Sequence, residues 1–111
     1  MVCSVSEVCG LDVLVVDDAS TDGTGSLARQ AGAEALFLAM NMGAWTAAQT
    51  GFRYALANGY ETVVTMDADG QHFAETIPTL LDTLYQSSSD VVIGASPERA
   101  TRCRRFSWSF F

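Results

Sequence analysis

Short apolar runs alternate with longer segments of helical spacing along this chain, and that alternation limits the folds available to it. The apolar runs cover residues 11–16, 35–39, 62–66 and 90–94, and we expect each to form a β-strand. Strands that alternate with helices are typical of a mostly parallel sheet with right-handed crossovers and helices on both faces. The sequence therefore predicts an α/β fold, and 111 residues are enough for one such domain.

Residues typical of helix ends mark the three expected helices, which cover residues 20–31, 44–57 and 74–85. Ser20 or Thr21 offers an N-cap for the first helix, and Gly32 is a typical residue after its end. The pair Asn58-Gly59 closes the second helix, because both residues tolerate the left-handed conformation. Pro78 suits the first turn of the third helix, where its missing N–H does no harm.

Apolar residues at helical spacing predict which side of each helix faces the core. The expected inward residues are Leu27, Ala28 and Ala31 in the first helix, Ala47, Ala48, Gly51, Phe52, Ala55 and Leu56 in the second, and Ile77, Leu80, Leu81 and Leu84 in the third.

Acidic residues dominate most of the chain. All 13 of them lie within residues 1–98, where the basic residues are Arg29 and Arg53. Residues 99–111 instead carry four arginines and four aromatic residues without a helix or strand period. We therefore expect a domain of residues 1–98 and an irregular basic and aromatic tail of residues 99–111. An acidic domain is poorly suited to the phosphate backbone of a nucleic acid, so we expect no nucleic-acid partner.

Signals that direct a protein out of the cytoplasm are weak in this sequence. The three cysteines are odd in number and match no CxxC spacing, which argues against a disulfide framework. No apolar run approaches the roughly 20 residues of a spanning helix, and the N-terminus lacks a signal-peptide pattern. We expect a cytoplasmic protein, and the composition of the tail leaves peripheral contact with the cytoplasmic face of a membrane open.

Carboxylates follow the first and the third expected strands. Asp17 and Asp18 end the first strand, and Asp67 and Asp69 come directly after the third. Parallel strands bring their carboxyl ends to one edge of the sheet, where ligands bind in folds of this kind, so we expect the four acids to share one site. Clustered carboxylates repel one another unless a cation relieves them, and Mg²⁺ or Mn²⁺ suits their oxygen atoms. The sequence thus predicts a divalent cation here that also binds a diphosphate.

Three neighbouring features leave alternatives open. An isolated Asp-x-Asp (DxD) sequence is also compatible with a solvated turn, so the metal prediction depends on both acid pairs. Gln71 is either a third, neutral metal ligand or the cap of the next helix. The turn Asn41-Met42-Gly43 opens the second helix, and its backbone N–H groups either meet an anion or form a tight connection.

Two other classes of protein share parts of this pattern. Residues 23–28 satisfy a GxGxxA dinucleotide fingerprint, but the acids in front of that helix would repel a pyrophosphate. The receiver domain of two-component signalling has similar acids, for which Asp17, Asp18 and Asp67 are candidates. That family also uses a late lysine, and this chain has no lysine. Both classes fit less well than a metal-assisted diphosphate site.

Five segments together resemble family-two glycosyltransferases, with the polyprenyl-phosphate (dolichol-phosphate mannose synthase-like) branch as the nearest likeness. They are residues 15–24, 41–43, 49–55, 67–72 and 91–94. The resemblance implies a Rossmann-like GT-A nucleotide-sugar-binding sandwich. It also implies an inverting, metal-assisted transfer of a hexose from a nucleoside diphosphate sugar, such as a UDP- or GDP-hexose, to an acceptor such as a polyprenyl phosphate.

The same resemblance assigns roles to individual residues. Those implied to contact the nucleotide sugar are Val16, Asp17, Asp18, Asp67 and Ala68, with the first three at the base and ribose. Those implied to hold the metal are Asp67, Asp69 and Gln71, with Asp69 as the catalytic carboxylate. Arg99 is a candidate for the acceptor phosphate.

The chain departs from the family pattern near both ends. It lacks the first strand with its Pro-x-Tyr-Asn-Glu-like motif, and we expect residues 1–10 to be the remnant of the helix after that strand. It also has Gly94-Ala95-Ser96-Pro97 where relatives commonly continue as Gly-Ser-Arg. These departures make a noncatalytic glycosyltransferase fragment the alternative to an active enzyme. The missing strand would leave an open sheet edge, which favours a homodimer.

Overall fold

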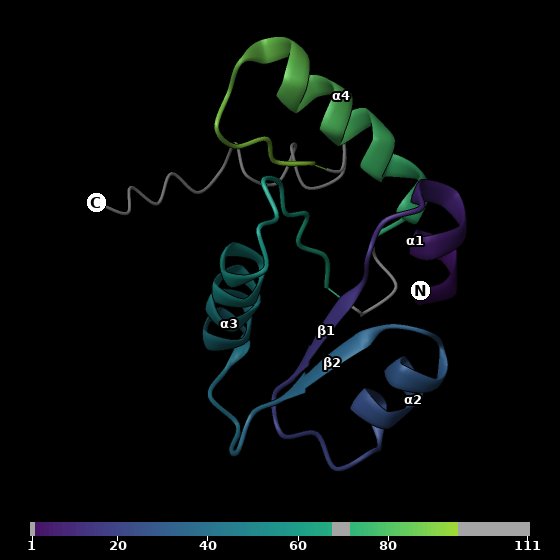
Figure 1. Cartoon of the computed structure of the whole chain (residues 1–111), viewed down its shortest axis with the longest axis vertical. Helices are drawn as coiled ribbons and strands as arrows, with labels where there is room; N and C mark the ends of the chain where they lie inside the picture. Colours follow the sequence, from purple (N-terminus) through teal and green to yellow (C-terminus); the bar gives the residue numbers. More distant parts are fainter. Residues whose placement is uncertain (1, 68–71, 96–111) are drawn as a thin grey trace, which may run out of the picture. The chain divides into compact units, whose positions relative to one another are not determined.

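The structure is a computed structural model that describes residues 2–67 and 72–95. Its elements are α1 (Val2–Cys9), β1 (Leu14–Asp17), α2 (Thr24–Gln30), β2 (Glu34–Phe37), α3 (Ala44–Ala57), the 3₁₀ helix η1 (Ala74–Thr76) and α4 (Ile77–Ser87), as Figure 1 shows. The chain divides into two compact units, Met1–Ile77 and Pro78–Phe111. Parallel strands that alternate with helices confirm the predicted α/β class.

Two parallel strands form the sheet of the first unit. β1 pairs with β2 so that Asp17 lies opposite Phe37 at their carboxyl ends. The Leu38 N–H continues this pairing by donating to the Asp17 carbonyl at 2.9 Å. α2 packs on both strands and α3 packs on β1, and the two helices lie on opposite sides of the strand pair in the view of Figure 1. Both strands therefore end at the edge where Asp17 lies.

Most of the predicted helix ends are confirmed. Gly32 after α2 has a φ of 91°, and Gly59 after α3 has a φ of 77°, values that glycine adopts without strain. α3 covers the predicted residues 44–57. Pro78 lies in the first turn of α4, where no helical hydrogen bond needs its N–H. The helix expected near the N-terminus is α1.

The predicted strands over residues 62–66 and 90–94 are wrong, because the described sheet consists of β1 and β2 alone. Side chains over residues 62–66 still alternate between half-buried and exposed, as they do in a strand. That alternation is a local property of the sequence. A strand also needs a neighbouring backbone in register, which no local pattern supplies.

Several apolar residues that were predicted to face the core are exposed instead. They are Leu27, Ala31, Phe52 and Leu56, of which Leu56 is 81% exposed. Ala28 and Ala55, on the same two helices, are buried as predicted. A sheet of two strands covers only a narrow stripe of each helix, so the wide apolar face that the spacing predicts is only partly covered.

Small residues make up most of the core of the first unit. Its buried apolar residues are Val5, Ala28, Ala33, Ala35, Ala55, Ala74 and Ile77. α1 packs against η1, where the Cys9 thiol donates to the Ala74 carbonyl at 3.7 Å. Ile77 is the largest fully buried side chain of the described residues, at 2% exposed.

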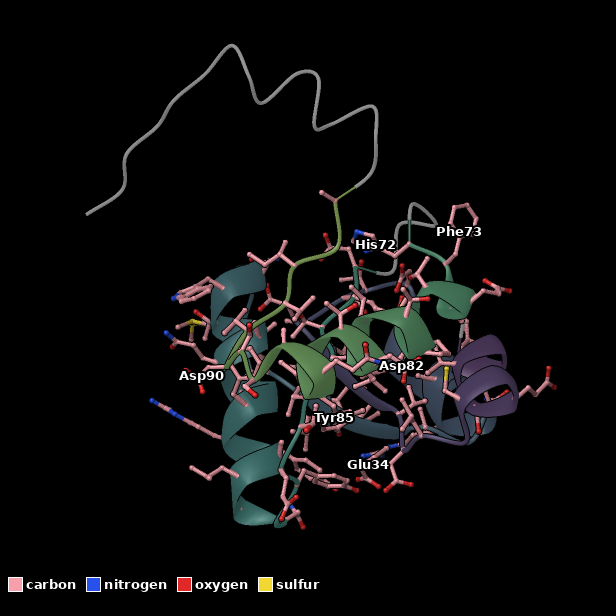
Figure 2. The ribbon with its side chains drawn as sticks, turned by 90° about the horizontal axis from the view of Figure 1, so that it is seen from above. Glu34, His72, Phe73, Asp82, Tyr85 and Asp90 are labelled. Carbon is pink, nitrogen blue, oxygen red and sulfur yellow. The ribbon has the colours of Figure 1, made fainter. Side chains whose placement is uncertain are left out.

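The described part of the second unit contains α4 beyond its first residue and an irregular segment up to Ala95. Leu80, Leu81 and Leu84 are half-buried on α4, as their spacing predicts. Asp82 and Tyr85 are exposed on the same helix and are labelled in Figure 2. No helix in the two described stretches combines the length and the apolar character that a membrane span requires.

Candidate functional site

Asp17 ends β1 and is the only buried charged residue among those described, with 5% of its surface exposed. Its Oδ1 accepts the Ser20 N–H at 2.8 Å, and its Oδ2 accepts the Gly25 N–H at 2.9 Å. A buried carboxylate is costly unless it is hydrogen-bonded, and these two bonds meet that need. Asp17 therefore braces the loop between β1 and α2.

The start of α2 corrects the predicted N-cap. The N-cap is Gly23, which has no side chain to offer, and not Ser20 or Thr21. The first N–H groups of a helix have no partner within the helix and need one from outside. The carboxylates of Asp17 and Asp22 supply it, since each accepts one of the first two N–H groups of α2.

Hydrogen bonds lower the pKa of both of these acids. Ser20, through its hydroxyl and its backbone N–H, holds the pKa of Asp17 below the ordinary value of 3.8. Thr24 lowers the pKa of Asp22 in the same way. Hydrogen bonds to the ionised form favour that form, so both carboxylates are charged at neutral pH.

Asp18 connects the end of β1 to the turn that precedes α3. Its Oδ1 accepts the Met42 N–H at 2.6 Å, and its Oδ2 accepts the Gly43 N–H at 2.7 Å. Gly43 is also the N-cap of α3. The sequence left open whether the Asn41-Met42-Gly43 turn meets an anion. In the structure two of its N–H groups do, and the anion is a side chain of this chain.

The remaining described candidates are Val16 and Asp67. Val16 is half-buried in β1 and faces Gly51 of α3, since a Cβ added at Gly51 would lie 3.7 Å from Val16 Cγ2. Asp67 is exposed, and its N–H donates to His72 Nδ1 at 3.1 Å. Phe73 follows, 65% exposed, and Figure 2 shows its ring directed outward beside His72.

Four predicted site residues lie outside the described part of the chain: Ala68, Asp69, Gln71 and Arg99. Within the described part, no three His, Cys, Asp or Glu side chains gather as a metal site would require. The structure thus brings Asp17 and Asp18 to one edge of the sheet, while the N–H of Asp67 donates to His72. The metal ligands stay predictions.

The guanidinium of Arg29 does not pair with the described carboxylates at this edge of the sheet. The Arg29 guanidinium donates to the Ala35 carbonyl at 2.8 Å and lies 4.7 Å from the centre of the Phe37 ring, which fixes it between α2 and β2. Both oxygens of Asp17 and of Asp18 accept from backbone N–H groups, which carry no net charge. The described edge is therefore anionic.

Comparison with known proteins identifies the family of this chain. The family described as glycosyl transferase family 2 matches residues 2–110. The chain belongs to glycosyl transferase family 2. This membership confirms the resemblance found in the sequence and the GT-A type of α/β fold that it implies, and it favours that family over a signalling receiver.

Named relatives belong to the polyprenyl-phosphate branch. The chain is 45% identical to an undecaprenyl-phosphate mannosyltransferase of Micrococcus luteus, over 76% of this chain and 36% of the relative. It is 34% identical to a polyprenol monophosphomannose synthase of Mycolicibacterium smegmatis, over 86% of this chain and 38% of the relative. No solved structure matches the chain. The chain thus spans little more than a third of the length of these relatives.

The hydrogen bonds that Asp22 and Asp18 accept from backbone N–H groups were not predicted from the sequence. Asp22-Gly23-Thr24 is a typical turn in which an Asp side chain binds a backbone N–H two residues on, and this signal could have placed the start of α2. The partners of Asp18 lie 24 and 25 residues away along the chain. No local pattern reports contacts of that separation.

Proposed function

We propose that this chain is the donor-binding part of a glycosyltransferase that transfers a hexose from a nucleoside diphosphate sugar to a polyprenyl phosphate, with inversion at the anomeric carbon. The observation that carries the proposal is its membership of glycosyl transferase family 2. The names of its relatives, a mannosyltransferase and a monophosphomannose synthase, support the sugar and the lipid class. The chain spans about a third of the length of those relatives, so the complete transfer activity is a proposal.

The donor nucleoside is proposed to bind beside Val16, Asp17 and Asp18. Support comes from their position, since ligands of open parallel sheets bind beyond the carboxyl ends of the strands. Each oxygen of the Asp17 carboxylate accepts one backbone hydrogen bond. An ionised carboxylate has about four acceptor positions, so capacity remains for hydroxyl and N–H groups of a ribose or base.

The charges at this edge favour a donor that is held through a cation. The N-terminus of a helix is a common phosphate site, because its free N–H groups and its dipole attract anions. Here Asp17 and Asp22 occupy that position at α2, and Asp18 occupies the turn before α3. A diphosphate would meet carboxylates instead, and a divalent cation between them removes the repulsion.

Asp67, Asp69 and Gln71 are proposed to hold Mg²⁺ or Mn²⁺, and Asp67 with Ala68 to lie against the nucleotide sugar. Asp67 fits this role, since it is exposed. Its oxygens are the hard ligands that both cations prefer. When bound, the cation would offset the negative charge that develops on the departing nucleoside diphosphate. Asp69 is proposed as the catalytic carboxylate through this role.

The acceptor chemistry needs little from the protein. A phosphate monoester has a second pKa of about 6, so the attacking oxygen of a polyprenyl phosphate is already ionised near neutral pH.

Arg99, in the basic tail, is proposed to bind that phosphate. The tail is also proposed to bring the chain to the cytoplasmic face of a membrane. Pairing of two copies through the open sheet edge is a further proposal.

A donor-binding chain without transfer activity of its own, a noncatalytic fragment, is the second candidate. A transfer assay separates the two. The full chain is incubated with Mn²⁺, radiolabelled GDP-mannose or UDP-glucose, and undecaprenyl phosphate in detergent. Labelled lipid that disappears in Asp69→Ala supports the enzyme. Donor binding without labelled lipid supports the fragment, and absence of both rejects the proposed function.

A further inference from the structure

We propose that Asp18 is a positioning residue, which holds the Asn41-Met42-Gly43 turn against the end of β1 and through that turn shapes the proposed donor site. The inference rests on the proposed function and adds to it the way in which one of its acids acts.

The geometry of the contact is that of a clamp. Both oxygens of Asp18 are used, and they accept the N–H groups of two successive residues, Met42 and Gly43, at 2.6 and 2.7 Å. Distances this short are typical of bonds in which the acceptor is charged. An asparagine could not replace this pair of bonds, because it has one acceptor oxygen and its NH₂ group would face an N–H donor.

The turn itself depends on this contact. Gly43 has a φ of 87° and a ψ of 159°, a backbone conformation that is essentially restricted to glycine. Its carbonyl accepts the Ala47 N–H at 3.1 Å, which is the first hydrogen bond of α3. The carboxylate of Asp18 therefore holds Gly43 in this conformation and fixes the place where α3 begins.

Asp18 differs in this respect from the acids beside it. Asp17 binds N–H groups three and eight residues further along the chain, and Asp22 binds one two residues further along. These two acids order their own loop. Asp18 alone of the three joins separate segments, the end of β1 and the turn before α3, and both segments border the edge proposed to bind the donor.

Amide hydrogen exchange of the full chain, measured by NMR, tests the clamp directly. In the wild type the Met42 and Gly43 amides should exchange much more slowly than in an unstructured peptide. Asp18→Asn should speed both by about tenfold or more, because one charged acceptor position is lost and a donor is introduced. Asp22→Asn is the matched control and should leave both amides unchanged. Fast exchange in the wild type, or no change in Asp18→Asn, overturns the proposal.

Donor binding then separates a positioning residue from a direct contact. Gly43→Ala strains the same turn and leaves the Asp18 carboxylate in place. If Asp18 acts through the turn, Gly43→Ala and Asp18→Asn should weaken the binding of GDP-mannose or UDP-glucose with Mn²⁺ by similar factors, and the double variant should be little worse than either. Loss of binding in Asp18→Asn with normal binding in Gly43→Ala overturns the proposal.

Failure of the proposed function gives a different pattern. In that case the wild type binds neither nucleotide sugar, and the amide exchange of Met42 and Gly43 decides alone whether Asp18 holds the turn. Far-UV circular dichroism checks that each variant is folded, and the exchange rates of the wild type test the proposal without any variant.

Discussion

Gly25, the second residue of α2, gives the sharpest test of the packing between α2 and the sheet. It is buried, and a Cβ added there would lie 2.7 Å from Asp17 Oδ2 and 2.8 Å from Phe37 Cζ, and closer still to Phe37 Cε1. In an ordinary helix, replacement of glycine by alanine stabilises the protein by up to about 1 kcal/mol. Here forced overlap costs about 1 to 3 kcal/mol, so we expect Gly25→Ala to lower the free energy of unfolding by about 1 to 2 kcal/mol.

The two contacts differ in how far they can relax. Phe37 is 51% exposed, so its ring can turn away, but the buried Asp17 carboxylate accepts the Gly25 N–H and is held in place. Movement of the helix away from β1 would stretch that hydrogen bond. Strain should therefore persist even where the ring turns.

Urea unfolding followed by far-UV circular dichroism measures the effect, with an unchanged m-value as the sign that only stability has moved. Gly51→Ala in α3 is the control, because its Cβ would meet only Val16 Cγ2, at an ordinary 3.7 Å. The control should gain about 0.5 to 1 kcal/mol, as glycine does elsewhere in helix interiors. A Gly25→Ala protein as stable as the wild type, or changes of the same sign in both variants, would refute the reasoning.

Three further outcomes are expected. The pKa of Asp17 is lowered in the folded chain, so its contribution to stability is present above pH 3.8 and is lost as the pH falls below that value. Acid unfolding should therefore be steeper in the wild type than in Asp17→Asn. The hydrogen bond to Asp12 raises the pKa of Tyr60 above 10.0, so its contribution to stability is present below pH 10 and is lost at higher pH. In a pH series of urea midpoints, Tyr60→Phe should remove this part of the loss of stability at alkaline pH. An unchanged alkaline slope would contradict this prediction. Ile77→Ala should lower the free energy of unfolding by about 2 to 5 kcal/mol, because Ile77 is the largest fully buried side chain among the described residues. A loss below about 0.5 kcal/mol would show that Ile77 is not in the core.

Features that depend on neighbouring residues could be predicted from the sequence. The ends of α2 and α3 at Gly32 and Gly59, and Pro78 in the first turn of α4, follow from backbone preferences within a few residues. The carboxyl-edge position of Asp17 and Asp18 follows from the length of the first apolar run. Each is decided by chemistry that the local sequence carries.

Features that depend on distant residues could not. Residues 62–66 keep the alternation of a strand, but a strand exists only where another backbone pairs with it, and the described sheet ends at β1 and β2. The width of that sheet in turn decides that Leu56 is exposed while Ala55 is buried. The contacts of Asp18 with Met42 and Gly43 likewise arise only when two loops meet at one edge.

The central claim is that the carboxylates at this edge bind a nucleoside diphosphate sugar through a divalent cation. Isothermal titration of the full chain with GDP-mannose and with UDP-glucose, each with Mn²⁺ and with EDTA, tests it most directly. We predict binding of one donor with Mn²⁺, none with EDTA, and none with Mn²⁺ in Asp69→Ala. Equal heats in the wild type with and without the cation, or in the wild type and Asp69→Ala, would contradict the claim.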